Sequence, residues 1–117
     1  VGTVALMAIT LVAIGSNRRH GRHGAPAGVV RAAIAALPGV VAASPIFTTA
    51  PLGPGTRRYA TAVVALDWPG TLPDLLRRLK GMERAFGRRR GRHWGDRVLD
   101  LDIIAAGDLV VRGRALT

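Results

Sequence analysis

The sequence predicts a single α+β domain in which two helices cover one face of an antiparallel sheet. Three observations lead to this fold class. The 117 residues are 49% hydrophobic, which is enough for one folded domain with a core of its own. Several short apolar stretches have the length or alternation of strands, and two stretches between them have helical spacing. Their order along the chain is β-α-β-β-α-β, which is typical of a ferredoxin-like sandwich.

The first predicted strand is the apolar run of residues 4–14, which has the composition of a strand buried in the centre of a sheet. It is too short to cross a bilayer as a helix, since that needs roughly 18 or more residues. It also lacks the basic start of a signal peptide, which is therefore the less favoured alternative. Residues 15–17 read GSN, and their turn chemistry predicts the end of the strand.

A polar loop that contains glycines and arginines is expected over residues 18–28. It holds His20 and His23, which are spaced i, i+3. A metal-binding pair is one interpretation of these histidines. Solvated side chains are far more common for two histidines among arginines in a glycine-rich loop, so we favour that interpretation.

The first helix is predicted over residues 26–37. Pro26 suits its first turn, and Pro38 with Gly39 ends it. Its apolar residues recur at helical spacing and predict a buried stripe made of Val29, Val30, Ala33, Ile34 and Leu37. Strands are then predicted over residues 40–48 and 59–66, separated by a rigid loop with the sequence PLGPG.

The second helix is predicted over residues 71–86. Thr71 can cap its first turn, Asp74 stands three residues later in the capping-box position, and Gly87 ends the helix. Its buried stripe is expected to consist of Leu72, Leu75, Leu76, Leu79, Met82 and Phe86, with the charged residues largely off this stripe.

The last long strand is predicted over residues 98–106, followed by a turn at residues 107–108 and a short strand over residues 109–111. Asp100 and Asp102 alternate there with leucines and an isoleucine. Because successive strand side chains point to opposite faces, both carboxylates should share one face, about 7 Å apart, while the leucines enter the core. Two such carboxylates offer the hard oxygen ligands that Mg²⁺ prefers.

Positive charge is concentrated directly before the two aspartates. The chain has 17 Lys and Arg against 7 Asp and Glu, a formal net charge of +10, and residues 88–97 read RRRGRHWGDR. Such a cluster predicts an anionic partner, whether nucleotide, nucleic acid or acidic membrane surface, more than it predicts a solubilising surface. Guanidinium groups beside carboxylates favour a metal–nucleotide site. The chain has no cysteine, which excludes thiol catalysis and cysteine-bound zinc and is compatible with a reducing compartment.

Three segments together resemble the 6-hydroxymethyl-7,8-dihydropterin pyrophosphokinase family. They are AIGSN at residues 13–17, TAPLGPG at residues 49–55 and ERAFGRRRGRHWGDRVLDLDII at residues 83–104. The first two are weak signals alone, whereas the third contains the specific pattern G-R-x-R-x-x-x-W-G-x-R-x-x-D-x-D. The resemblance covers nearly the whole chain, so it implies one pyrophosphokinase-like domain over residues 1–117.

The family transfers pyrophosphate from ATP to the hydroxymethyl group of a reduced pterin in folate biosynthesis, giving AMP. The resemblance therefore implies a cytoplasmic, ATP- and Mg²⁺-dependent diphosphokinase whose partners are ATP and a small pterin, not nucleic acid or membrane. It implies two Mg²⁺ ions held by Asp100 and Asp102. The catalytic residues that it implies are Arg88, Arg90, Arg97, Asp100 and Asp102. The ATP-binding residues that it implies are Lys80, Glu83, Arg88, Arg90, Arg92, His93, Trp94, Arg97, Ile103 and Thr117.

The residues that the resemblance implies for the pterin side are Gly15, Thr49, Ala50, Pro51, Leu52, Tyr59 and Thr61. Four positions depart from the family pattern. Thr61 stands where the family usually has asparagine, whose amide offers the pterin a donor and an acceptor that threonine cannot both replace. Lys80 stands for glutamine, His93 for arginine and Asp96 for proline.

Family members continue past the position of Thr117 with a Pro-His motif and an R-x-F segment, which add ATP contacts and a second aromatic wall for the pterin. We therefore expect a domain truncated at its C-terminus, with weakened turnover if nothing follows. Two alternatives stay open: a degenerate relative that binds nucleotide without turnover, and a small basic nucleic-acid-binding domain. The chain has only five aromatic residues, two Trp, one Tyr and two Phe, and they form no platform on which bases could stack. This weighs against the nucleic-acid-binding alternative. A monomer or weak dimer is expected, because a bare sheet edge invites pairing.

Overall fold

The computed structural model describes residues 4–18, 20–49, 59–87 and 98–112. Its elements are β1 (Val4–Ser16), α1 (Pro26–Ala36), β2 (Val40–Ala43), β3 (Phe47–Thr49), β4 (Tyr59–Asp67), α2 (Leu72–Ala85) and β5 (Asp100–Arg112). The predicted order is confirmed, with the second predicted strand divided into β2 and β3. Neither of the described helices is long and apolar enough to cross a membrane.

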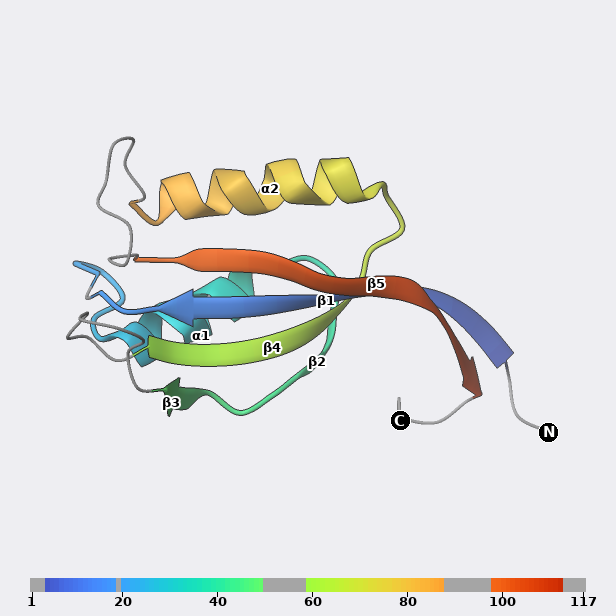
Figure 1. Cartoon of the computed structure of the whole chain (residues 1–117), viewed down its shortest axis with the longest axis horizontal. Coiled ribbons are helices and arrows are strands. Elements are labelled where there is room, and N and C mark those ends of the chain that lie inside the picture. The colour runs from blue at the N-terminus through green and yellow to red at the C-terminus, as the bar shows by residue number, and fades with distance from the viewer. Residues whose placement is uncertain (1–3, 19, 50–58, 88–97, 113–117) are drawn as a thin grey trace.

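The strands form one antiparallel sheet in the order β2-β4-β1-β5, and the short β3 also pairs with β4. β1 lies in the centre, with β4 along one side and β5 along the other (Figure 1). The first residues of β1 and the last residues of β5 continue together beyond the helices, where Val4 lies opposite Arg112. The predicted antiparallel α+β sandwich is thus confirmed.

The core lies between the two helices and one face of the sheet. Burial alternates along β4, whose covered side chains are Ala60, Ala62, Val64 and Leu66. β1 has the same period of two, with Thr10, Val12, Ile14 and Ser16 covered. Side chains of both helices complete the core, among them Val29, Val30, Ala33, Leu75 and Leu79.

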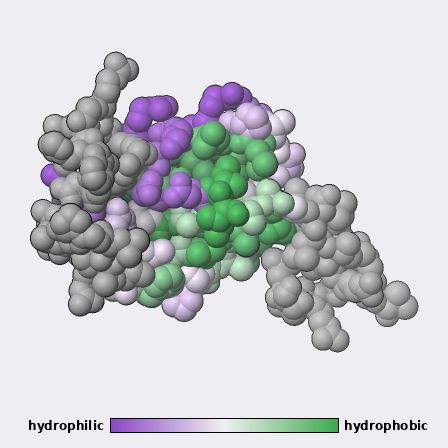
Figure 2. Space-filling view, in the orientation of Figure 1, coloured by the Kyte–Doolittle hydropathy of each residue, from purple (hydrophilic) through white to green (hydrophobic). Residues whose placement is uncertain are grey.

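The other face of the sheet, here called the open face, carries the alternate residues of the same strands. Ile9, Leu11, Ala13, Val63 and Ala65 are only half-buried there. The first strand is central, as predicted, and its burial has a period of two, with one face in the core and the other half-buried. Figure 2 shows hydrophobic side chains gathered over the middle of the strands and hydrophilic ones gathered along α2.

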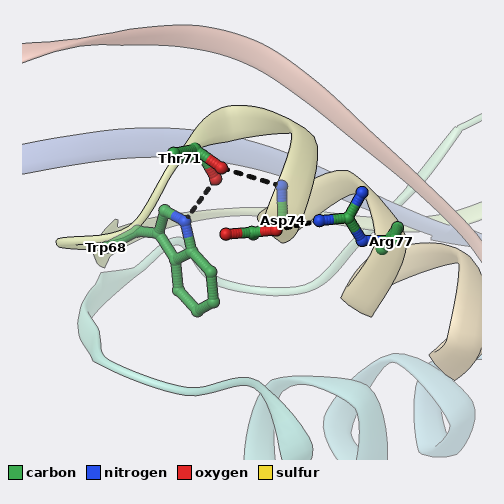
Figure 3. Close-up of polar contacts among 4 residues, drawn as sticks. All are labelled: Trp68, Thr71, Asp74 and Arg77. Atoms are coloured by element: carbon green, nitrogen blue, oxygen red, sulfur yellow. Dashed lines mark hydrogen bonds and ion pairs between the residues drawn. The ribbon is translucent and has the colours of Figure 1, made fainter.

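The start of α2 is fixed by the side chain of Thr71, as predicted. The hydroxyl oxygen Oγ1 of Thr71 accepts the N–H of Asp74 at 3.2 Å, while its carbonyl accepts the indole N–H of Trp68 at 2.8 Å (Figure 3). The Asp74 carboxylate pairs with the exposed guanidinium of Arg77, one turn further along the helix. These contacts satisfy a donor that the first turn of a helix leaves without a partner.

The buried stripe of α2 differs from the predicted one. Leu72 and Leu76 are 44% and 46% exposed, whereas the fully buried positions are Leu75, Leu79 and Glu83. These three follow one another at intervals of four residues, so they lie on one face of the helix. A charged residue therefore occupies a place in the core stripe, and two of the predicted leucines lie outside it.

The predicted strand over residues 40–48 is interrupted because it has one more residue than the stretch of β4 that it pairs with. Ala43 lies opposite Val64 and Phe47 opposite Thr61, so four steps along one strand match three along the other. The chain bulges at Ser44, whose hydroxyl accepts the N–H of Val63 at 2.9 Å. The next residue is a proline, which has no N–H for the ladder, and this explains why the pairing breaks there.

β5 begins at Asp100 and continues through the turn that was predicted at residues 107–108. Gly107 lies opposite Ile9, and the pairing runs on to Arg112 because the first half of β1 supplies a partner strand. One irregularity interrupts the ladder between Leu11 and Val12, where β5 carries Ile104 as an extra residue, 54% exposed. The prediction of a turn and a separate short strand was wrong because it weighed Gly and Asp locally and ignored this partner.

Candidate active site

Asp100 and Asp102 project from the open face of the sheet. Asp100 lies opposite Gly15 and Asp102 opposite Ala13, while Leu101 between them lies opposite Ile14 and is 1% exposed in the core. Since side chains alternate along a strand, both carboxylates must lie on the face opposite the helices. Asp100 is half-buried and Asp102 is exposed. The prediction that the two aspartates share one face is confirmed.

A row of residues crosses the open face at the level of Asp100. Gly15 of β1 lies opposite Asp100 on one side and opposite Thr61 of β4 on the other, and Thr61 in turn lies opposite Phe47 of β3. Neighbouring strands are about 4.8 Å apart, so the backbones at Thr61 and Asp100 are separated by about 10 Å. The bare backbone of Gly15 forms the floor between them.

Tyr59 lies against this floor. A Cβ atom placed on Gly15 would be 3.4 Å from the ring carbon Cδ1 of Tyr59, so the ring lies close to the glycine backbone. A methyl group at position 15 would be in van der Waals contact with the ring, so a larger side chain that extends towards Tyr59 would displace it. Three residues predicted for the pterin side, Gly15, Tyr59 and Thr61, are therefore brought together beside Asp100, although they come from two strands far apart in the sequence.

The described residues on either side of the arginine-rich segment 88–97, Gly87 and Val98, lie close to the start of β5. Gly87 ends α2 with a φ of 108°, and a Cβ atom built on it would be 3.9 Å from a methyl group of Val98, two residues before Asp100. Thr49 lies opposite Tyr59, so the described residues that flank segment 50–58 also lie at this end of the sheet. Figure 1 shows that β1 ends, and β4 and β5 begin, at this same end.

Many predicted site residues fall within these two segments or beyond residue 112, outside the described residues. They are Ala50, Pro51, Leu52, Arg88, Arg90, Arg92, His93, Trp94, Arg97 and Thr117. The roles that the resemblance gives them stay predictions.

Glu83 has a different environment from the one expected of a nucleotide ligand. Its side chain is 1% exposed, and its Oε2 accepts the backbone N–H of Leu101 at 2.8 Å. Its Oε1 lies 3.4 Å from the ammonium of Lys80, a side chain that is 47% exposed. The predicted contact of Glu83 with ATP finds no support in this burial, because the carboxylate is turned into the protein and links α2 to β5.

Ile103 is also placed away from the aspartates. It lies opposite Val12, on the helix side of the sheet, and its half-buried side chain packs against the core. The position of this side chain does not test the ATP-binding role predicted for Ile103, which stays a prediction.

The two loop histidines were predicted to be solvated side chains. In the structure they are half-buried, and their rings pack against one another. The ring of His23 stacks on those of His20 and Phe86, with centroid distances of 4.8 Å and 5.3 Å. His20 Nδ1 accepts the backbone N–H groups of Arg22 and His23. Within the described ranges, no group of three or more His, Cys, Asp or Glu side chains is arranged to hold a metal ion.

The chemistry of the aspartate pair suits a hard divalent cation that completes its coordination with other ligands. Two carboxylates on neighbouring same-side positions supply part of an oxygen shell and leave the rest to water or phosphate oxygens, which is how Mg²⁺ is commonly held beside nucleotides. The site thus fits a metal shared with a polyphosphate better than a closed structural metal site.

Comparisons with known proteins agree with this arrangement. Residues 11–116 match the family model of 7,8-dihydro-6-hydroxymethylpterin-pyrophosphokinase. A protein of Pseudomonas aeruginosa, 2-amino-4-hydroxy-6-hydroxymethyldihydropteridine pyrophosphokinase, is 40% identical over 103 residues, which are 83% of this chain and 60% of the relative. A protein of the same name from Pseudomonas putida is 39% identical over 105 residues, 86% of this chain and 83% of the relative.

A third relative with this name, from Haemophilus influenzae, is 35% identical over 79 residues, which are 67% of this chain and 49% of the relative. The chain thus spans about 60% of the length of the Pseudomonas aeruginosa protein and less of the Haemophilus one. The family match nevertheless includes Gly15, Tyr59, Thr61 and both aspartates. Because the match extends over most of the chain and contains the whole open-face row, the protein belongs to the 7,8-dihydro-6-hydroxymethylpterin-pyrophosphokinase family.

Proposed function

We propose that the protein transfers pyrophosphate from ATP to the hydroxymethyl group of 6-hydroxymethyl-7,8-dihydropterin, giving AMP, in folate biosynthesis. The observation that carries this proposal is the placement of Asp100 and Asp102 on one face of β5, with Asp100 in a row with Gly15 and Thr61. The names of the relatives support the same substrates. We place the activity in the cytoplasm, where ATP and reduced pterins are found together.

Asp100 and Asp102 are the residues that would hold divalent cations. When bound there, Mg²⁺ would neutralise phosphate charge and stabilise charge that develops during transfer. The protein itself has little covalent chemistry to do in such a reaction, because the rate depends mainly on holding the two substrates in line. The rigid start of β5, fixed by Leu101 in the core, suits that task.

The flat ring of the pterin is proposed to lie over Gly15, between Thr61 and the aspartates, with Tyr59 beside it. A glycine floor lets a ring approach the backbone closely, and the ring of Tyr59 already lies against that floor. The hydroxyl of Thr61 can offer one donor or acceptor to the edge of the heterocycle. The substrate hydroxymethyl group would then point towards Asp100, about 10 Å across the sheet from Thr61.

Arg88, Arg90 and Arg97 are proposed to bind the phosphates from the opposite side. The described residues that flank their segment, Gly87 and Val98, lie close together, two residues before Asp100 in the case of Val98, which supports this role. Guanidinium groups bind phosphate oxygens through paired N–H donors, which makes them suited to a triphosphate that also carries metal ions. Lys80, in the second half of α2, is proposed to add a further positive charge; its side chain is 47% exposed, and its ammonium also lies 3.4 Å from Oε1 of Glu83.

Isothermal titration with a non-hydrolysable ATP analogue tests the proposal directly. Binding that depends on Mg²⁺ and weakens at least about tenfold in Asp102→Ala is expected, and AMP should form from ATP and the hydroxymethylated pterin in a chromatographic assay. Mg²⁺-dependent binding without any AMP would favour the degenerate relative, which the departures at Thr61, His93 and Asp96 suggest. Absence of Mg²⁺-dependent binding would remove the proposal.

A nucleic-acid-binding domain is the alternative from a different class. The net charge of +10 is the observation that favours it. The aspartates on the open face weigh against it, since two carboxylates repel a phosphodiester backbone. Salt-sensitive binding of single-stranded oligonucleotides that ATP and Mg²⁺ do not displace would support this alternative.

A further inference from the structure

We infer that Glu83 is a positioning residue for the Asp100–Asp102 pair and not a ligand of the nucleotide. Glu83 lies on α2, on the helix side of the sheet, whereas the two aspartates lie on the open face. The inference rests on the proposed function, because it gives Glu83 a task in the proposed Mg²⁺ site.

The first observation is the burial of the Glu83 carboxylate. The side chain is 1% exposed, on a helix stripe that otherwise carries Leu75 and Leu79. A carboxylate is costly to remove from water unless it is well bonded, so its presence in the core indicates a specific bond. One such bond is the 2.8 Å contact from the N–H of Leu101 to Oε2, and Lys80 adds a cation 3.4 Å from Oε1.

The second observation is where this bond lies. Leu101 is the residue between the two aspartates, and its N–H donates to Glu83 and not to β1. Because β5 is the last strand in the sheet order, an N–H on this outer side has no neighbouring strand to bond among the described elements. Leu101 is thereby held from three directions: by β1, by the core around its side chain and by Glu83. Because side chains alternate, fixing Leu101 also fixes the directions of Asp100 and Asp102.

The third observation explains why such a bond is needed. The β1–β5 ladder has an extra residue at Ile104, two positions after Asp102, and pairing can shift at such an irregularity. A slip by one residue would turn both aspartates towards the core and Leu101 towards the open face. Glu83 bonds β5 on the site side of the irregularity, so it holds the register in which both carboxylates are available for metal.

Mn²⁺ is the probe for the test, with its free concentration followed by electron paramagnetic resonance in the presence of a non-hydrolysable ATP analogue. Glu83→Leu keeps an apolar side chain in the core and removes the acceptor, and we expect it to weaken Mn²⁺ binding by about tenfold or more. Glu83→Gln keeps an acceptor oxygen at the same position, and we expect its affinity to stay within about twofold of the parent protein.

A second measurement follows the bond itself. Amide hydrogen exchange of Leu101, measured by NMR without any ligand, is expected to be fast in Glu83→Leu and slow in Glu83→Gln. Leu79→Ala is the matched control, since it removes a buried side chain one turn earlier on the same helix and leaves the carboxylate of Glu83 in place. It should lower Tm while leaving the Mn²⁺ affinity of the folded protein unchanged. If Glu83→Leu does not fold, Glu83→Asp replaces it, because the shorter side chain keeps the charge but withdraws it from Leu101.

Three results would overturn the inference. The first is a Mn²⁺ affinity that Glu83→Leu leaves unchanged. The second is an equal loss of Mn²⁺ affinity in Glu83→Gln, which would mean that the charge of Glu83 itself acts on the metal ligands. The third is an equal loss of Mn²⁺ affinity in Leu79→Ala, which would mean that only the stability of the fold matters. A different result would contradict the proposed function: Mn²⁺ would bind with equal affinity to the parent protein and to Asp102→Ala. The exchange of the Leu101 amide reports on the Glu83 bond in either case.

Discussion

Asp100 lies directly opposite Gly15, in the register that also sets Thr61 opposite the same glycine from the other side. One backbone position thus joins the carboxylate pair to the residues proposed for the pterin. The connection depends on the strand order, because β1 is the central strand that separates β4 from β5. A substrate lying over Gly15 would be within reach of both neighbouring strands.

Asp102→Ala is expected to weaken Mg²⁺-dependent nucleotide binding at least about tenfold while leaving the fold intact. The side chain is exposed, so its loss should change the free energy of unfolding by no more than about 0.5 kcal/mol. Calorimetric titration of the ATP analogue and a thermal melt measure the two effects. Asp74→Ala is the control, because Asp74 is an exposed carboxylate on the helix side of the molecule whose partner is Arg77. A large fall in Tm for Asp102→Ala would mean that this aspartate is structural.

Gly15→Val is expected to weaken binding of the hydroxymethylated pterin by about tenfold, since overpacking typically costs 1–3 kcal/mol. A Cβ atom at this position already lies 3.4 Å from the ring of Tyr59, and the two methyl groups of valine would displace the ring. NMR shifts of the Tyr59 ring and fluorescence titration of the pterin follow the change. Gly21→Val is the matched control, because a Cβ atom there has nothing within 4 Å. Equal pterin affinity in both variants would place the pterin elsewhere.

The sequence alone was sufficient for the local part of this fold. Helical spacing located both helices to within about one residue, and the alternation of leucines with Asp100 and Asp102 set their common face. Thr71 was correctly identified as the helix cap because its role depends on the residues that follow it directly. Each of these predictions depends only on residues that are close to one another in the sequence.

The features that were missed depend on partners far along the chain. β5 continues through Gly107 because the start of β1 pairs with it, about a hundred residues earlier in sequence. Glu83 appeared to be a surface charge because charged residues rarely enter a core, and its acceptor role requires the edge of β5. One signal was available: Glu83 follows Leu75 and Leu79 at intervals of four, on the buried face.

Thr71→Ala is expected to lower the free energy of unfolding by about 1 kcal/mol, because the hydroxyl that accepts the N–H of Asp74 is lost. This corresponds to a fall in Tm of about 4 °C for a domain of this size. Nucleotide binding at saturating Mg²⁺ should not change, since Thr71 lies at the end of α2 remote from Gly87. Thr71→Ser keeps the acceptor and should melt close to the parent protein. Equal Tm values for the Ala and Ser variants would show that the cap contributes nothing.

Thr61→Asn is expected to tighten pterin binding by about tenfold. Threonine offers the heterocycle a hydroxyl, whereas the amide of asparagine supplies a donor and an acceptor together, and an unpaired polar edge costs about 1–3 kcal/mol. Thr61 is half-buried on the open face, opposite both Gly15 and Phe47, so the longer side chain can extend over the glycine floor. Thr48→Asn is the matched control, since Thr48 lies opposite Ala60 and therefore belongs to the other face of the sheet. Fluorescence titration of the pterin measures both variants, and an affinity that Thr61→Asn leaves unchanged would mean that the edge of the pterin is not bound at this position.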